Sequence, residues 1–465
     1  MSGRNTEHKQ VEKNGNTCII SVVPFYFWRS EPVMTLRVIL FLLASLPFVY
    51  DLISLSIIDR KRREPLPEEV RDVYTKERWQ QFVSYKHDLR MPHILLQCIE
   101  LLTDAIVIFS PFYSFIERLS HGNPYGAVIW TSVILTVIPC LVNMPIYHYI
   151  TFGIREKYGL NRFTKAEFRK DRLIEEGGSF LLNTALYLLF AFALVHIYSW
   201  TNGFSLPFGH AALLTVGILV VFYSAVLGLS WLSWRMMRMQ YTFTPLEEGD
   251  LKEKILTLIK GSKKKVRKIE VYNESKKSTT KNAFVLKILN YRSIGIADNF
   301  LNENSEEELL AVLSHEAGHL KHKPDLRNWI NWGLLGAGVI VLILLFSNHG
   351  SILVQMEEQL ERSFHLTAMN PVLTVTAVLW LLKPLGFCFS VWRNYVSRCE
   401  EYEADRNAVK EGYGEALIRT FKEISTDELV DVNPSTIIEF IEYDHPGMAH
   451  RIQAIHAAEA ATASS

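Results

Sequence analysis

Cysteine and charge are both scarce in this chain of 465 residues. Only five cysteines are present, and none of them forms a Cys-x-x-Cys pair. A disulfide scaffold and a cysteine-based zinc site are therefore not expected. Charged residues make up 21% of the chain, and the 49 basic residues equal the 49 acidic ones. This zero net charge excludes a generic nucleic-acid-binding protein that is steered by positive charge.

Hydrophobic residues, in contrast, form long uninterrupted blocks. They make up 49% of the chain, and the mean hydropathy of +0.09 is higher than soluble proteins of this size normally show. Each block can cross about 30 Å of hydrocarbon as a helix. The composition therefore predicts an α-helical membrane protein with seven transmembrane helices in a lipid bilayer. The seven predicted spans cover residues 34–58, 93–116, 126–152, 179–200, 209–236, 327–347 and 371–392.

The loops between these spans alternate in charge. Residues 59–92 and 153–178 are rich in Lys and Arg, whereas 117–125 holds one basic residue and 201–208 holds none. Basic loops stay on the cytosolic side of a membrane. We therefore expect the two long polar stretches, which are described next, to face the cytosol.

The spans and the polar stretches divide the chain into five predicted segments. The five are an N-terminal tail at 1–33, transmembrane helices one to five with their loops at 34–236, a polar segment at 237–326, helices six and seven at 327–392, and a C-terminal helical segment at 393–465.

Several ionisable residues interrupt the predicted spans. Glu100, Asp104 and Lys383 lie well inside them. Ionisable groups in a bilayer are costly and usually face a polar interior rather than lipid. We therefore expect the spans to enclose a water-filled chamber.

The first polar stretch combines strand patterns with one capped helix. Residues 267–272, 282–289 and 292–298 have the apolar and β-branched composition of strands, and a short turn at 290–291 separates the last two. They predict a small antiparallel sheet. A Ser-x-x-Glu capping box at 305–308 then predicts the start of a helix.

That helix carries a His-Glu-x-x-His motif. His315 and His319 are four positions apart and share a helix face, so both imidazoles can reach one metal ion, for which zinc is the usual choice. Glu316 can then act as the base for a zinc-bound water. The metzincin pattern is absent, because His322 and Asp325 stand where that class has Gly and His. His322 lies on another helix face and is expected outside the ligand set.

The third zinc ligand has to come from elsewhere in the chain. Glu401 and Asp405 are also four positions apart on one face of a predicted helix, beside the small residues Ala404 and Ala408. Glu401 can bind the ion while Asp405 orients a ligating imidazole. Spacing alone leaves a solvated acidic helix face equally possible.

The motifs together resemble the integral-membrane CAAX prenyl protease family of zinc metalloproteases. The similar segments are "YGLNRFTKAEFRKDRL", "KNAFVLKILNYRSIGIADNFL", "LSHEAGHLKHK", "NYVSRCEEYEADRNAV" and "DHPGMAHRI". The resemblance implies a helical barrel around a chamber, with Glu401 as zinc ligand and Asp405 as an acid of the catalytic site. It also implies that the strand at Asn282 and Ala283 contacts the substrate.

We therefore interpret the chain as a membrane-embedded endopeptidase with one Zn²⁺ per chain, and with peptides or prenylated proteins as substrates. His445 and Arg451 are candidates for stabilising the oxyanion, and an added β-strand is the expected mode of substrate binding. The active site is expected on the cytosolic side of the endoplasmic reticulum membrane in a eukaryote, or of the plasma membrane in a bacterium. Two alternatives remain, a general quality-control protease and a transporter or receptor with a structural metal. The oligomeric state stays open.

Overall fold

The computed structural model describes one mainly helical chain with a small sheet. The N-terminal tail predicted for 1–33 lies almost wholly outside the described residues, and so does much of the sixth predicted span at 327–347. The structure describes residues 33–464 except 202–206, 261–264, 289–290, 323–325, 328, 332, 335 and 339–349.

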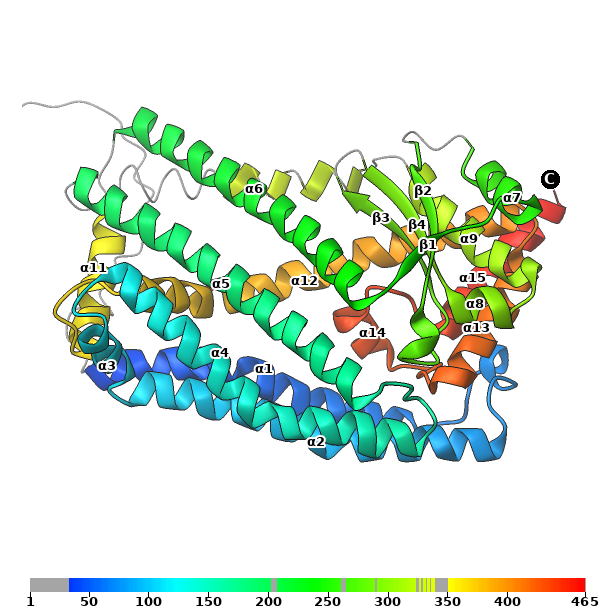
Figure 1. The fold of residues 1–465 in the computed structure, drawn as a ribbon, viewed down its shortest axis with the longest axis horizontal. Coiled ribbons are helices and arrows are strands. Elements are labelled where there is room, and N and C mark those ends of the chain that lie inside the picture. The colour runs from blue at the N-terminus through cyan, green and yellow to red at the C-terminus, as the bar shows by residue number, and fades with distance from the viewer. Residues whose placement is uncertain are drawn as a thin grey trace, which may run out of the picture.

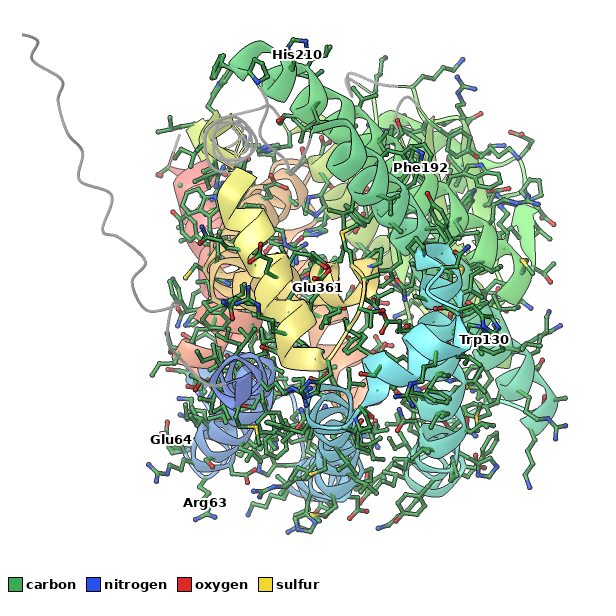
Figure 2. All side chains as sticks on the ribbon, turned by 90° about the vertical axis from the view of Figure 1, so that its left-hand side faces the viewer. Arg63, Glu64, Trp130, Phe192, His210 and Glu361 are labelled. Carbon is green, nitrogen blue, oxygen red and sulfur yellow. The ribbon has the colours of Figure 1, made fainter. Side chains whose placement is uncertain are left out.

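Long helices run side by side along the longest axis of the molecule (Figure 1). At one end they carry the sheet and the C-terminal helices, and at the other end two short helices, α3 (Phe112–Leu119) and α11 (Gly350–Phe364). Figure 2 looks from that second end, with Glu361 of α11 near the middle of the view. The long helices are α1 (Val33–Lys61), α2 (Lys76–Phe109), α4 (Pro124–Tyr149), α5 (Lys165–Thr201), α6 (Phe208–Gln240) and α12 (Pro371–Lys410).

Five helices in the described part of the chain are long and apolar enough to cross a membrane. They overlap the first four predicted spans and the seventh. The fifth predicted span lies in α6, whose apolar part Phe208–Val221 is shorter. The count of seven spans stays a prediction. The five helices are Met34–Lys61, Lys76–Phe109, Pro124–Arg155, Lys165–His196 and Pro371–Lys410.

The predicted span at 93–116 is not one helix. It breaks where Ser110 precedes Pro111, and Ser110 has extended backbone angles, φ −86° and ψ 172°. A proline disfavours the helical conformation in the residue before it, so α2 ends at Phe109 and α3 starts after the proline. The span prediction was wrong at this end.

The sheet has four strands in the order β1-β2-β4-β3. β2 and β4 pair in parallel, whereas β3 and β4 form the predicted antiparallel hairpin. The prediction of an antiparallel sheet was therefore wrong for one pair, because β4 inserts between β2 and β3. β1 was not predicted, and β3 is an edge strand. The strands are β1 (Phe243–Pro245), β2 (Lys268–Tyr272), β3 (Ala283–Ile288) and β4 (Tyr291–Ala297).

One face of the sheet packs on a helix that holds the His-Glu-x-x-His motif. Ile294 and Ile296 of β4 are almost fully buried against Leu309 and Leu313 of that helix. Burial of such side chains contributes about 1.5–3 kcal/mol each. The helices at this end are α7 (Asp250–Leu258), α8 (Asp298–Glu303), α9 (Glu306–Lys321), α13 (Gly414–Glu428), α14 (Thr436–Glu442) and α15 (Met448–Ala463).

Two helices run without a break from the membrane region into this end of the molecule. α6 continues to Gln240, and α12 continues through the predicted boundary at 392–393 to Lys410. Because α12 is a single helix, the position of its membrane part determines the position of Glu401.

Candidate active site

The metal-binding motif lies on α9, which begins with the predicted capping box. The Ser305 side chain accepts a hydrogen bond from the backbone N–H of Glu308, and the Glu308 carboxylate accepts one from the backbone N–H of Ser305. These two bonds satisfy donors that the first helical turn leaves free. His315 and His319 follow on the same helix.

α12 packs directly against α9 because both helices carry small residues at the contact. A Cβ atom added to Gly318 would lie 2.7 Å from the Cα of Ala404, which is closer than any real Cβ contact. Ala404 and Ala408 are almost fully buried. The close approach that the small residues predicted is confirmed, and it brings the acidic face of α12 to the two histidines.

The carboxylate of Glu401 meets both imidazoles. Its Oε2 lies 3.4 Å from Nε2 of His315, and its Oε1 lies 3.1 Å from Nε2 of His319. Two atoms bound to one tetrahedral zinc ion at about 2.0–2.1 Å stand roughly 3.3 Å apart. Oε2 is buried and has no hydrogen-bond partner among the described residues. The donor set of two imidazoles and one carboxylate therefore fits a zinc ion.

Glu316 lies next to these donors without a hydrogen-bond or ion-pair partner of its own in the described part of the chain. Nitrogen or oxygen atoms of His315, Glu316 and His319 all lie within 4.8 Å of one another. Glu316 is partly exposed. An unengaged carboxylate at this distance is free to exchange a proton with a substrate or a water molecule.

Behind His315, two further side chains fix the orientation of its ring. Asp405 Oδ1 lies 2.9 Å from Nδ1 of His315, so Nδ1 carries the proton and Nε2 faces Glu401. Arg451 of α15 donates to both oxygens of Asp405. The guanidinium carbon of Arg451 lies 4.0 Å from the ring centre of Phe421. Arg451 also lies 3.5 Å from Oε2 of Glu401, so its charge is shared between the two carboxylates of α12.

Electrostatics favour a cation at this place. Burial disfavours protonation of His315, but Asp405 and Glu401 outweigh it and raise the pKa of its imidazole to about 9. Burial raises the pKa of the Glu401 carboxyl, yet the two imidazoles bring it well below its usual range. Burial likewise opposes ionisation of Asp405, and the charge of Arg451 holds its pKa below the usual value. Both carboxylates are therefore charged at neutral pH.

Two more histidines, His445 and His322, lie near the site but occupy different positions relative to the metal donors. His445 Nε2 is 3.5 Å from Glu401 Oε1, and more than half of this side chain is exposed. It therefore lies at the open side of the site. His322 does not join the donors, because its Nδ1 contacts Glu403 at 2.7 Å. The expectation that His322 lies outside the ligand set agrees with this position.

The edge strand β3 lies next to α9. Lys287 of β3 donates to the backbone carbonyl of His319 at 3.3 Å. Ala283 is buried in the core below the sheet, and the carbonyl of Asn282 accepts a hydrogen bond from Ala297. The predicted substrate strand and the motif helix therefore lie side by side.

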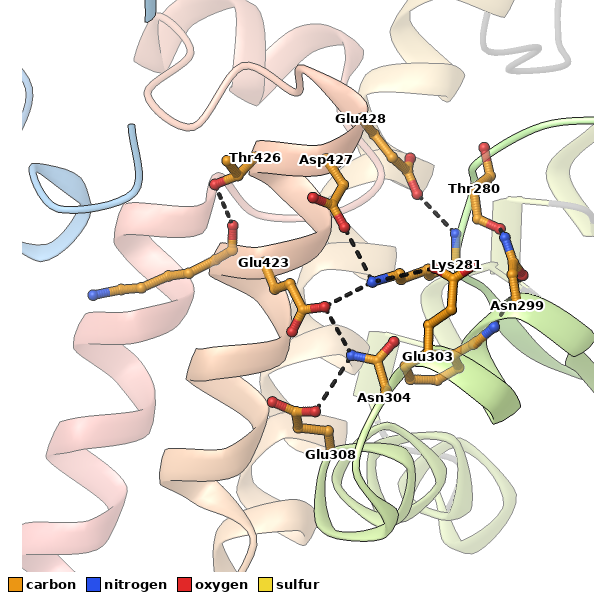
Figure 3. Close-up of polar contacts among 12 residues, drawn as sticks. Thr280, Lys281, Asn299, Glu303, Asn304, Glu308, Glu423, Thr426, Asp427 and Glu428 are labelled. Atoms are coloured by element: carbon orange, nitrogen blue, oxygen red, sulfur yellow. Dashed lines mark hydrogen bonds and ion pairs between the residues drawn. The ribbon is translucent and has the colours of Figure 1, made fainter. Parts of the chain in front are cut away.

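A buried lysine holds the start of this strand in place (Figure 3). Lys281 reaches Glu423 at 2.7 Å and Asp427 at 3.0 Å, both on α13. Asn304 donates to Glu423 and also to Glu308 of the capping box. One cluster of polar contacts thus links the strand, α13 and the first turn of α9.

Sequence reasoning missed the Lys281 cluster and Phe421. Neither carries a signal in the sequence, because a lysine before a strand and a phenylalanine in an amphipathic helix are both common. Gly318 did carry such a signal, because a glycine inside a helix usually marks a place where another element packs closely. The hydrogen bonds from Arg451 to Asp405 were also not predicted.

Two family models match the sequence. A model of peptidase family M48 matches residues 245–459, and a model described as the CAAX prenyl protease N-terminal region with five membrane helices matches residues 57–228. The metal-binding motif and Glu401 lie within the first match, and the second to fifth predicted spans lie largely within the second, which begins at the end of the first span.

Relatives of known type match over most of the chain. A CAAX prenyl protease 1 homolog of Arabidopsis thaliana is 24% identical over 408 residues, which cover 84% of this chain and 90% of that protein. CAAX prenyl protease 1 of Saccharomyces cerevisiae is 28% identical over 391 residues, 81% of this chain and 80% of that protein. The crystal structure of S. mikatae Ste24p has the same fold, with a TM-score of 0.71 at 20% identity over 92% of this chain and 100% of that chain.

The fold, the site and these matches define an integral membrane metalloendopeptidase. The alternative of a transporter or receptor is thereby excluded. The chain belongs to the CAAX prenyl protease family, as the sequence motifs indicated.

Proposed function

We propose that this protein is a zinc endopeptidase that cleaves membrane-anchored peptides, including prenylated CAAX-type substrates. The observation that carries the proposal is the meeting of Glu401 with His315 and His319, with Asp405 behind the first imidazole. One zinc ion per chain fits these three donors and leaves a fourth position, as catalytic sites do.

The chemistry divides between the ion and the side chains. Zinc held there would supply Lewis-acid chemistry that polarises a scissile carbonyl and acidifies water. Glu316 takes the proton of the attacking water and passes it to the leaving amine. Asp405 keeps the His315 ring in place. His445, at the open side of the site, is better placed than Arg451 to donate to the oxyanion, because Arg451 is already bonded to Asp405.

The substrate would pair with the free edge of β3. Ile288 and Tyr291 close the hairpin, and the Asn282 carbonyl bonds to β4, so the backbone groups of the even-numbered residues face β4. Those of Ala283, Val285 and Lys287 then face the free edge. An extended peptide that adds here as a strand would lie next to α9.

The orientation in the membrane follows from the charged loops. We infer that the metal-binding end faces the cytosol, in the endoplasmic reticulum of a eukaryote or in the plasma membrane of a bacterium. The division into segments 1–33, 34–236, 237–326, 327–392 and 393–465 belongs to the same proposal.

Glu316→Gln tests the assignment of the base. The variant should retain zinc, because the three donors are unchanged, and should lose peptidase activity by several orders of magnitude. Zinc analysis and peptide hydrolysis by the purified full chain measure both. Glu307→Gln on the exposed side of α9 is the matched control and should keep wild-type activity. Wild-type turnover by Glu316→Gln would refute the role.

A matched pair of peptides tests the substrate class. One is prenylated at a cysteine and the other is not, and both are assayed in detergent and in liposomes. Preference for the prenylated peptide supports the CAAX assignment. Equal kcat/KM for both peptides in both media would instead favour a general quality-control protease.

A further inference from the structure

A second polar site lies inside the membrane region, away from the metal-binding residues. A cavity of about 420 Å³ lies between α2, α4 and α12. Its polar lining comes from residues inside the predicted spans or at their ends. The residues that matter here are Gln97, Glu100, Asp104, Tyr113, Asn143 and Trp380.

The carboxylates in this cavity lack protein partners. Neither Glu100 nor Asp104 makes a hydrogen bond or a close ion pair within the described ranges. Lys383 lies near enough to act on the charge of Asp104, and its ammonium group donates to the carbonyl of Ala44 at 3.2 Å. Two carboxylates with one lysine near Asp104 leave an excess of negative charge in a region where charge is costly.

Three neutral groups around the cavity are also unsatisfied. The amide nitrogen of Gln97 donates to Asp51, while its Oε1 is buried and has no hydrogen-bond partner among the described residues. The same holds for Oδ1 of Asn143. The hydroxyl of Tyr113, a residue that is 1% exposed, lies beside Thr376 without a hydrogen bond of good geometry.

The unused groups have a common chemical character. Apart from the hydroxyl of Tyr113, these groups are the amide oxygens of Gln97 and Asn143, which only accept hydrogen bonds, and two carboxyl groups, which when ionised are negatively charged and only accept. A ligand that satisfies them must donate several hydrogen bonds and carry a positive charge. An ammonium or guanidinium group meets both conditions.

α12 contributes residues to both the cavity and the metal site, so the distance between these two places follows from helix geometry. Trp380 lines the cavity and Glu401 lies 21 positions later on the same helix, so the two are about 32 Å apart at 1.5 Å per residue. An extended peptide covers that distance with about ten residues.

We propose that this cavity is a subsite for a lysine or arginine side chain of the substrate, located about ten residues from the scissile bond. The proposal rests on the proposed peptidase function. It adds a specificity element to the reaction, because the basic residue anchors the arm of the substrate that extends into the membrane domain. A free inorganic cation would instead be coordinated by the same oxygen atoms and is the other possible source of positive charge.

The test uses a series of otherwise identical prenylated peptides in which one lysine moves from four to fourteen residues from the scissile bond. Wild type, Glu100→Gln with Asp104→Asn, and the control Glu358→Gln are assayed as full chains in liposomes. Glu358 is an exposed acid of α11 and does not line the cavity. With the wild type, we expect the lowest KM for the peptide whose lysine lies about ten residues from the scissile bond. In the double variant, but not in the control, the KM of this peptide should rise roughly tenfold.

Each outcome decides between the possibilities. A lysine effect that is absent, independent of position or unchanged in the double variant would overturn the subsite, even though the peptides are cleaved. Replacement of sodium by choline at constant ionic strength tests the free cation. If a lysine-free peptide then loses turnover only with the wild type, the cavity binds the free ion and the substrate assignment is wrong. No chelator-sensitive cleavage of any peptide would instead refute the proposed function.

Discussion

Arg451 donates two hydrogen bonds to Asp405, from Nε to Oδ2 at 2.9 Å and from Nη2 to Oδ1 at 2.6 Å. Asp405 in turn lies 2.9 Å from Nδ1 of His315. The C-terminal helix α15 therefore orients a histidine of α9 through a residue of α12. Three helices that are far apart in the sequence have to assemble before the imidazole points at Glu401.

Asp405→Asn should weaken the site without removing a zinc donor. The amide has no charge and cannot stabilise the protonated Nδ1 as well, so zinc affinity or activity should fall by about 10–100-fold. Competition with a chelating dye measures the affinity. Asp250→Asn, at an exposed position of α7, is the control and should behave as wild type. An unchanged zinc affinity would show that Asp405 does not act on His315.

Replacement of Glu401 by alanine should have a larger effect than loss of the acids on either side. Glu401→Ala removes one of three zinc donors and leaves two imidazoles, so zinc should be lost on dialysis. Glu400 and Glu403 instead contact His322. Their alanine variants should keep a full equivalent of zinc in elemental analysis. Equal zinc loss in all three would mean that the ligand is not Glu401.

Gly318→Ala should separate the two helices that carry the donors. The new methyl group would meet the backbone of Ala404 at 2.7 Å, so α9 and α12 must move apart and the donors with them. Both zinc content and the melting temperature should fall. Gly177→Ala is the matched control, because its added methyl group meets nothing within 4 Å. It should be neutral or stabilise by about 0.5–1 kcal/mol.

Glu428→Gln should stabilise the protein at neutral and higher pH. Burial, with further repulsion from Asp427 and Glu274, raises the pKa of Glu428 to about 7 in the folded chain. An unfolded glutamate has a pKa of about 4.3, so the folded state holds this proton more tightly and loses stability as pH rises from about 4.3 to 7. The loss is on the order of 4 kcal/mol at most.

The glutamine side chain can still accept the hydrogen bond from the backbone N–H of Lys281, which Glu428 accepts at 3.1 Å (Figure 3). Melting temperatures from pH 4 to 9 give the test. The difference between the variant and wild type should be near zero at pH 4, grow up to about pH 7 and then stay constant. A difference that does not depend on pH would show that Glu428 has an ordinary pKa.

The parts of the site that follow local rules could be predicted from the sequence. The capping box at Ser305 needs only a four-residue pattern, and the shared face of Glu401 and Asp405 needs only helix geometry. The family resemblance is confirmed by the two family models and by matches that cover 90% and 80% of two relatives.

Long-range pairing could not be predicted in the same way. The parallel pairing of β2 with β4 depends on where the chain places a third strand, and no local pattern encodes that choice. The contacts of Lys281 likewise join residues about 142–147 positions apart. The break at Ser110 was foreseeable from Pro111, but the apolar residues on both sides of it concealed it.

α12 runs as one helix from Pro371 to Lys410. Its membrane part lines the acidic cavity and its other part positions Glu401, so a movement of one part also moves the other. A bilayer that is thicker or thinner than this helix requires changes its tilt. Because α12 packs directly on α9, a change in tilt acts on the contact that brings Glu401 to His315 and His319, and the thickness of the lipid becomes a physical variable of the peptidase reaction.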